Sequence, residues 1–450
     1  MARAGKRRGR WRSWCSLPAR ATSPKTMACV STRQRAGWCG AAGKDADDDP
    51  CAAGAFAMGV KLSILALLLA VAAPVAARAP SLVPADAPER SAPGPLPVGV
   101  RELRFAAAPG RTLGLTLWYP AAAASAPTRY PHQIVNPPAG VPEMMIFEGT
   151  ASADAAPAAG PRLPLLLFSH GLGRWSTAMS GMAENMASRG YVVASIDHDD
   201  QGAQDPAKWL QVFATAFVRR SADQRAAIAW LQGFARGKDP LAARIDATNI
   251  AVIGYSMGGY GALATGGAGY ARSGPMVDKV PAGSMDAVLE GAGADPAVKA
   301  LVLLAPWGGG ADVRAWTPAA LASVRAPSLW VMGDQDDVAM SAGIRWLHDA
   351  AVHSDRRLIV FANARHNVGG NPPPAAAPDT GRLRDMLDEA AWRKDMMDAI
   401  IFRQMGAFLD LTLKGDASAA QWLDADDKGA LKGFQKRWQL GLTATHTPAR

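Results

Sequence analysis

Short runs of apolar residues alternate with helix-like segments over most of the chain. Three early runs, at 163–168, 191–196 and 249–254, carry no charged side chain. Such short, continuous runs are typical of strands buried on both faces of a parallel sheet. Similar runs follow at 298–304, 328–332 and 358–361. The alternation predicts an α/β fold with a mostly parallel central sheet and helices on both faces.

Turn and cap signals predict the remaining elements. Residues 98–105 and 113–119 are expected to form two strands joined by a Pro-Gly turn. The following stretch, 120–162, is rich in Ala and Pro and is predicted to be a long loop. A Ser-x-x-Gln capping box predicts that a helix begins at Ser221. Residues 385–413 are expected to form one long C-terminal helix.

A segment near the start has the organisation of an export signal. Met58 begins a short charged stretch, and an uncharged apolar run and small residues up to Ala77 follow it. Residues 58–77 are therefore predicted to be a signal peptide, which makes the protein periplasmic or secreted. The apolar run is shorter than the roughly 20 residues of a membrane-spanning helix, so no stable span is expected after cleavage. A membrane-anchored or cytoplasmic protein is the alternative.

The segments around this signal complete the predicted domain organisation. Residues 1–57 show no periodic pattern, and we interpret them as a disordered extension or a start-site error. Residues 78–97 are predicted to be a Pro-rich linker. Residues 98–450 are predicted to form the catalytic domain.

Charge and cysteine content separate the extension from the rest of the chain. Residues 1–57 hold eleven Lys and Arg and four Asp, so they carry +7 of the net charge of +9. The near-neutral remainder gives no support for a nucleic-acid partner. All four cysteines also precede residue 58, and none forms a CxxC pair. The rest of the chain, residues 58–450, is called the body below. It has no thiol nucleophile, no thiolate metal ligand and no disulfide, and we expect neither a metal nor another cofactor.

The strongest chemical signal is a G-x-S-x-G motif centred on Ser256, between a predicted strand and a predicted helix. In that context the motif is typical of a nucleophile elbow, a tight turn that presents a serine above the sheet. Serine needs a base and an orienting acid to act as a nucleophile. His366 follows an apolar strand on a loop and is the expected base. Asp336 is the expected acid, with Asp337 and Asp334 as alternatives in the same loop.

An ester hydrolase also needs donors for the developing oxyanion. The backbone N–H groups of Met257, after the nucleophile, and of Leu172, in the loop after strand 163–168, are the expected pair. His170 in that loop is interpreted as a support for the loop and not as a base. Trp175 and Trp307 are candidates for lining the acyl pocket, or are ordinary core aromatics.

Several of these motifs carry a family resemblance. The block at 168–200, which begins FSHGLG, the elbow GYSMGG at 254–259, GDQDD at 333–337 and His366 resemble the α/β-hydrolase superfamily. Within it they resemble the plasma-type platelet-activating-factor acetylhydrolases and bacterial dienelactone hydrolase-like proteins, over roughly residues 98–412. The resemblance implies a Ser-Asp-His esterase or lipase without a cofactor, and it implies the same two oxyanion donors. True dienelactone hydrolases use a cysteine nucleophile, which this body lacks.

The sequence as a whole predicts a serine hydrolase that cleaves small-molecule or lipid esters, with short acyl chains favoured. A lipase or cutinase-like polyester hydrolase on the same triad is one alternative, and a catalytically silent binding module is another. Gly-, Ala- and Pro-rich insertions at 266–297 and 367–384 are expected to form loops over the site. Arg219, Arg220 and Arg225 are expected to lie on a solvated helix face. The oligomeric state stays open.

Overall fold

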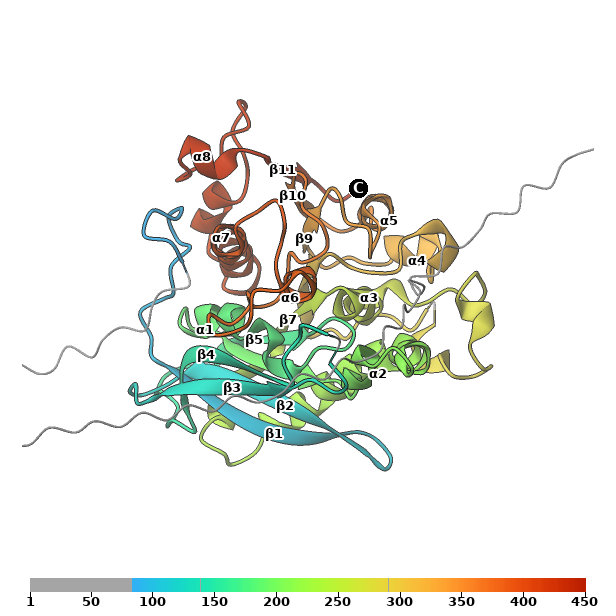
Figure 1. Ribbon diagram of the computed structural model, residues 1–450, viewed down its shortest axis with the longest axis horizontal. Coiled ribbons are helices and arrows are strands. Elements are labelled where there is room, and N and C mark those ends of the chain that lie inside the picture. The colour runs from blue at the N-terminus through green and yellow to red at the C-terminus, as the bar shows by residue number, and fades with distance from the viewer. Residues whose placement is uncertain (1–82, 138, 290) are drawn as a thin grey trace, which may run out of the picture. The chain divides into compact units, whose positions relative to one another are not determined.

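The computed structural model describes residues 83–137, 139–289 and 291–450, which belong to one compact unit, Pro74–Arg450. The extension and signal peptide predicted over residues 1–77 lie outside this part of the chain. Within the described residues, eleven strands form a single sheet in the order β11-β10-β9-β8-β7-β5-β6-β2-β1-β4-β3 (Figure 1). The six neighbouring strands β10, β9, β8, β7, β5 and β6 pair in parallel. Antiparallel pairs, β10 with β11 and β6 with β2, flank them on both sides.

The strand bounds follow the apolar runs of the sequence closely. The parallel core consists of β5 (Leu163–Ser169), β6 (Val192–Asp197), β7 (Ile245–Tyr255), β8 (Val298–Leu304), β9 (Ser328–Gly333) and β10 (Arg356–Phe361). The flanking strands are β1 (Val98–Ala108), β2 (Arg111–Pro120), β3 (Pro127–Gln133), β4 (Met144–Ala153) and β11 (Leu442–Thr447). Nearly every side chain of the parallel core is buried, because helices cover both faces. The predicted α/β-hydrolase fold is confirmed.

Eight α-helices accompany the sheet in the described part of the chain. They are α1 (Ser180–Ala187), α2 (Trp209–Phe234), α3 (Met257–Leu263), α4 (Pro318–Ala322), α5 (Ser341–Ala350), α6 (Gly381–Leu387), α7 (Lys394–Leu413) and α8 (Lys436–Gln439). Helices α2 and α3 contact each other, as do α1 and α7. Helices α3 and α7 both pack on β7 and β8, and Figure 1 shows that the two pairs lie on opposite faces of the sheet.

The long loop predicted over 120–162 is wrong, because this stretch contains β3 and β4. Side chains of β4 alternate between buried and exposed positions, as in a strand with one solvated face. Its small and polar residues concealed that period in the sequence. Strand β3 contains Pro127 and Pro131, which an edge strand tolerates because half of its backbone groups need no partner.

Two helix bounds also differ from the prediction. Helix α2 begins at Trp209, twelve residues before the predicted start, so Ser221 lies buried in mid-helix and caps nothing. The single C-terminal helix is in fact two, α6 and α7, separated by residues 388–393. The side chain of Thr380 caps α6 by accepting the N–H of Leu383 at 3.2 Å.

The described part of the predicted Pro-rich linker packs against the body. Val83 and Ser91 are buried, and Arg90 pairs with Asp410 of α7 at 2.6 Å. Asp86 accepts the indole N–H of Trp438 at 3.1 Å. Residues 83–97 are therefore part of the folded unit. No helix in the ranges that the structure describes has the length and apolar character needed to cross a membrane.

Candidate active site

The register of the parallel strands brings four loops to one edge of the sheet. Ser169 at the end of β5 pairs with Gly254 near the end of β7. On the other side, Gly333 at the end of β9 pairs with Phe361 at the end of β10. Because parallel strands place their carboxyl ends together, the loops after β5, β7, β9 and β10 converge there. Every residue of the predicted triad lies on these loops.

Ser256 lies at a strained turn between β7 and α3. Its backbone has φ 53° and ψ −113°, a region that a residue with a Cβ rarely adopts. Its N–H donates to the carbonyl oxygen of Leu304 at 2.9 Å, which holds the turn against β8. A Cβ on Gly254 would overlap the backbone of Gly258, and one on Gly258 would overlap the carbonyl of Ser169. Both motif glycines are therefore required by close backbone approach.

Ser256, His366 and Asp336 form a continuous chain of hydrogen bonds. The Nε2 atom of His366 lies 2.9 Å from the Oγ of Ser256, and its Nδ1 lies 2.8 Å from the Oδ2 of Asp336. The serine and the histidine come within hydrogen-bonding distance although they are 110 residues apart. With Nδ1–H donating to the carboxylate, Nε2 is free to accept the serine proton.

The backbone fixes the carboxylate of Asp336. Its Oδ1 accepts the N–H groups of Val338 at 2.9 Å and Ala339 at 2.8 Å. Burial raises the pKa of Asp336, but the hydrogen bond and charge of His366 and the two N–H donors outweigh it, so the pKa is lowered overall. Asp336 therefore stays ionised at neutral pH.

The two alternative acids have other partners. The carboxylate of Asp337 pairs with Arg365 at 2.8 Å on the exposed rim of the site. Asp334 accepts the N–H of Asn363 at 2.7 Å and ties the loop after β9 to the turn after β10. The structure thus brings only Asp336 of these three onto the imidazole of His366.

Tyr255 is a site residue that the sequence did not reveal. Its ring lies against the imidazole of His366, with 5.3 Å between ring centroids and 31° between the planes. Its hydroxyl donates toward the carbonyl oxygen of His366 at 3.3 Å. The position directly before the nucleophile was the only available signal, and it did not specify an aromatic role.

A cavity of about 590 Å³ opens at Ser256. Leu172 and Met257, the expected oxyanion donors, both line it, and so does Trp307. Two aromatic residues of α2, Trp209 and Phe213, extend the same wall. The rings of Trp209 and Phe213 stack at 5.1 Å between centroids, and the edge of Phe213 meets Trp307 at 5.3 Å. One side of the cavity is therefore aromatic.

Trp175 lies elsewhere and does not line this cavity. It is buried, with its ring 4.1 Å from that of His132 and 6.5 Å from that of Phe147, measured between centroids. These contacts make it a core aromatic between the loop after β5 and the β3–β4 hairpin. Of the two candidate pocket tryptophans, the structure places only Trp307 at the site.

One of the two predicted insertions reaches the cavity. Within the insertion 367–384, Gly381 and Arg384 of α6 line the cavity, and Glu389 lines it from just beyond this insertion. Arg174 donates to the carbonyl oxygen of Met386 and holds this segment beside the loop after β5. None of the described residues in the other insertion, 266–297, lines the cavity.

A second Ser-His-Asp triplet lies behind the first and has the same bonding pattern. The Oγ of Ser169 is 2.8 Å from the Nε2 of His198, whose Nδ1 is 3.1 Å from the Oδ2 of Asp223. Ser169 is 0% exposed, whereas Ser256 is 8% exposed and lines the 590 Å³ cavity. Access to substrate therefore distinguishes the two serines, and hydrogen-bond geometry does not.

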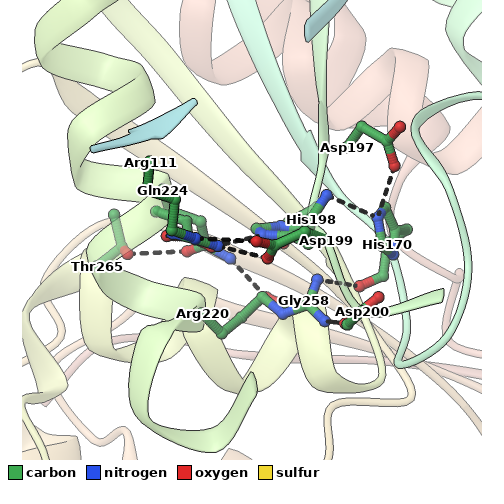
Figure 2. Close-up of polar contacts among 12 residues, drawn as sticks. Arg111, His170, Asp197, His198, Asp199, Asp200, Arg220, Gln224, Gly258 and Thr265 are labelled. Atoms are coloured by element: carbon green, nitrogen blue, oxygen red, sulfur yellow. Dashed lines mark hydrogen bonds and ion pairs between the residues drawn. The ribbon is translucent and has the colours of Figure 1, made fainter. Parts of the chain in front are cut away.

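The acidic cluster after β6 and the helix α2 form a partly buried ionic network (Figure 2). Arg111 pairs with Asp199 at 2.6 Å and with Asp223 at 2.5 Å. Arg220 pairs with Asp200, and both side chains are buried. The expectation that Arg220 decorates a solvated face is therefore wrong, because Arg220 lies on the face of α2 that packs on α3. No group of three or more His, Cys, Asp or Glu in the described ranges could hold a metal ion.

Comparison with known proteins gives a family likeness for about the first third of this unit. The family model described as platelet-activating factor acetylhydrolase, isoform II, matches residues 86–214. The chain resembles the platelet-activating factor acetylhydrolases. The acetylhydrolase of Gallus gallus is 40% identical over 73 residues, which are 16% of this chain and 15% of the relative. That of Cavia porcellus is 29% identical over 134 residues, 22% of this chain and 31% of the relative.

These matches cover short segments of the chain and of its relatives. The acetylhydrolase of Bos taurus matches over 64 residues at 39% identity, 13% of this chain and 14% of the relative. The matched segments thus span between 14% and 31% of the length of these three relatives. The family model includes the loop with Leu172 and ends at residue 214, before Ser256. The roles of the elbow, the acid and the histidine therefore rest on geometry.

Proposed function

We propose that this protein is a serine hydrolase of carboxylic esters that works through a covalent acyl-enzyme. The Oγ of Ser256 attacks the acyl carbonyl carbon while Nε2 of His366 takes its proton. Asp336 holds the imidazole in the required tautomer and stabilises the imidazolium. The C–O bond to the alcohol then breaks, and the imidazolium donates its proton to the leaving oxygen. Water, activated by His366, releases the acid and restores the serine.

The backbone N–H groups of Leu172 and Met257 are proposed to bind the oxyanion of each tetrahedral intermediate. Both residues lie at the cavity beside Ser256, one in the loop after β5 and one in the first turn of α3. Losing one such donor in a serine hydrolase costs on the order of 10²–10³ in rate. The two positions therefore supply a large share of the proposed catalysis.

The observation that carries this proposal is the Ser256–His366–Asp336 hydrogen-bond chain at the floor of an open cavity. The strained elbow and the likeness to acetylhydrolases support it independently. Since the relatives are named for removing an acetyl group, a short acyl group is the proposed substrate feature. Neither a metal nor another cofactor is required by the proposed steps.

An ester presented at a lipid surface is a second candidate substrate, and one observation favours it. Trp209 and Val338 line the cavity and are 46% and 52% exposed. Leu210 and Met340, close by along the chain, are 72% and 52% exposed. Apolar side chains grouped at the mouth of a cavity are a feature of lipid-contacting sites. We also propose that the protein is exported, on the basis of the signal sequence at 58–77.

Hydrolysis of p-nitrophenyl esters from acetate to palmitate tests both candidates. Full-length protein should hydrolyse the short esters, and Ser256→Ala should reduce the rate by about 10³-fold or more. Activity that falls with acyl length supports an acetylhydrolase-like esterase. A preference for long chains, with a rate increase once the ester forms a dispersed phase, supports the lipase alternative. Equal rates in both proteins would overturn the proposed nucleophile.

A further inference from the structure

A buried amide of helix α2 binds the first turn of α3, which carries one of the two proposed oxyanion donors. The Nε2 of Gln224 donates to the carbonyl oxygen of Gly258, in the first turn of α3, at 3.0 Å. Its Oε1 accepts the hydroxyl of Thr265 at 2.8 Å, so the amide orientation is fixed. Gln224 is 0% exposed and faces the helix that carries the N–H of Met257. Figure 2 shows these contacts.

One turn earlier, the same face of α2 contacts the loop after β5, which carries the other proposed donor. The Nη1 of Arg220 donates to the carbonyl oxygen of His170 at 3.1 Å, and its Nη2 pairs with Asp200. The Oδ1 of Asp200 accepts the N–H of Gly173 at 3.2 Å. The Arg220–Asp200 pair therefore holds both ends of the short loop that carries Leu172.

Within that loop, His170 is a neutral support. Its Nε2 accepts the backbone N–H of His198 at 3.2 Å, so Nδ1 carries the proton and donates to the carbonyl of Gly171 at 2.7 Å. Burial, with the nearby His198 and Arg220, holds the pKa of His170 well below its usual value. Asp197 lies 4.0 Å from Nε2, but a neutral ring with its lone pair there makes no ion pair with it.

We propose that Arg220 and Gln224 are positioning residues that set the spacing between the two oxyanion donors, the N–H groups of Leu172 and Met257. Residues four apart on an α-helix lie on one face at a fixed separation. Each of these two side chains binds a carbonyl within two peptide units of one donor. Helix α2 thus acts as a rigid brace between the loop that carries Leu172 and the first turn of α3. This inference rests on the proposed function and names the residues that hold its oxyanion donors in place.

The expected effect is on the transition state and not on substrate binding. An oxyanion donor acts only once negative charge develops on the substrate oxygen. A displacement of about 1 Å at such a site can cost about 10²-fold in rate. Replacing Gln224 should therefore lower kcat about 10- to 100-fold and leave KM within about 3-fold.

Gln224→Met tests the first half of the brace, because it keeps the length of the side chain and removes the donor. Gln232→Met is its matched control, since Gln232 lies on the same helix and its amide faces Asp295 at 3.5 Å. Rates are measured with p-nitrophenyl acetate and are divided by the concentration of sites titrated with a fluorophosphonate. A trifluoromethyl ketone, whose adduct places an oxyanion in the hole, gives a second readout. A purely structural role would lower the number of titrated sites and leave kcat per site unchanged.

The double variant Arg220→Met with Asp200→Asn tests the second half without leaving an unpaired buried carboxylate. The oxygen of the new amide can still accept the N–H of Gly173. We expect kcat per site and affinity for the trifluoromethyl ketone to fall together in both variants, and neither to change in Gln232→Met. If the wild-type protein is active and either variant that folds keeps both values within 2-fold, the inference is overturned and the proposed function stands. If wild-type and Ser256→Ala rates are equal, the proposed function fails and the inference fails with it.

Discussion

The phenol ring of Tyr255 packs on the imidazole of His366, and its hydroxyl points at the carbonyl oxygen of the same residue, 3.3 Å away. The same ring lies against Gly171 and Gly369, where an added Cβ would come within 3.2 Å and 2.8 Å of it. Tyr255 therefore joins the nucleophile elbow to the histidine loop and to the loop of Leu172. This contact keeps the imidazole in line with Ser256.

Two substitutions of Tyr255 should distinguish the contribution of its ring to kcat from that of its hydroxyl. Tyr255→Phe keeps the packing and loses a hydroxyl shared between two long contacts, with the carbonyl of His366 at 3.3 Å and Oδ1 of Asn367 at 3.4 Å. Their loss is worth about 1 kcal/mol or less, so kcat should fall no more than about 5-fold. Tyr255→Leu removes the surface on which His366 rests and should lower kcat by at least about 10-fold. Ester hydrolysis rates of both variants check this. Tyr119→Phe, which loses a 2.8 Å bond to Ala155 far from the site, is the control and should keep full activity.

The three neighbouring aspartates should differ sharply in their effect on activity. Asp336→Asn reverses the tautomer that the imidazole needs and should lower kcat by about 10³–10⁴-fold. Asp337→Asn removes an exposed ion pair with Arg365 and should stay within about 3-fold of wild type. Steady-state kinetics of the two variants with one ester decide the matter. A larger loss of kcat in Asp337→Asn than in Asp336→Asn would show that Asp337 is the acid of the triad.

The elbow glycines should be intolerant of a methyl group. Gly258→Ala forces a Cβ onto the carbonyl of Ser169, which is backbone and cannot move aside, so we expect a loss of about 3 kcal/mol or more in unfolding free energy. Gly233→Ala, near the end of α2, meets only Arg236 at 4.0 Å and should be neutral or stabilising by up to about 1 kcal/mol. Chemical denaturation of both variants measures the difference. Similar stabilities would contradict the close approach of the elbow to β5.

Stability should fall on acidification because of buried neutral histidines. Burial lowers the pKa of His198 to about 4, below the usual value near 6.5. Between these two pH values the unfolded chain binds a proton that the folded chain does not, so the unfolding free energy decreases as pH falls through this window. His198 alone should remove about 2 kcal/mol between pH 7 and pH 5.

His198→Gln provides the comparison for that pH dependence. The variant lacks the titrating ring, so its unfolding free energy should change less between pH 7 and pH 5 than that of the wild type, whatever its absolute stability. Denaturant unfolding at the two pH values measures both slopes. Parallel slopes would show that His198 is not a source of the acid sensitivity.

The sequence predicted the parts of this protein that have a strong local signal. The apolar strands of the parallel core and the G-x-S-x-G turn were found because burial and close backbone approach restrict the residues allowed. Once the order of strands is known, the loops holding Asp336 and His366 follow from topology, since carboxyl ends of parallel strands share an edge.

What the sequence could not show depends on contacts between distant segments. The sequence predicted a solvated helix face for Arg220, but its side chain is buried where α2 packs on α3, a contact that the sequence does not show. Trp175 and Trp307 are equivalent in sequence terms, yet only one faces the cavity. Likewise Ser169, His198 and Asp223 show triad geometry without access, which no spacing rule distinguishes.

Mapping the site of fluorophosphonate attachment tests the identity of the nucleophile most directly. Full-length protein is treated with the reagent, and the modified peptide is identified by mass spectrometry, with Ser256→Ala treated in parallel. We expect one adduct on Ser256, none on the buried Ser169, and no adduct in the variant, with loss of ester hydrolysis in proportion to labelling. An adduct on Ser169, or unchanged hydrolysis after full labelling of Ser256, would contradict the proposed role of Ser256.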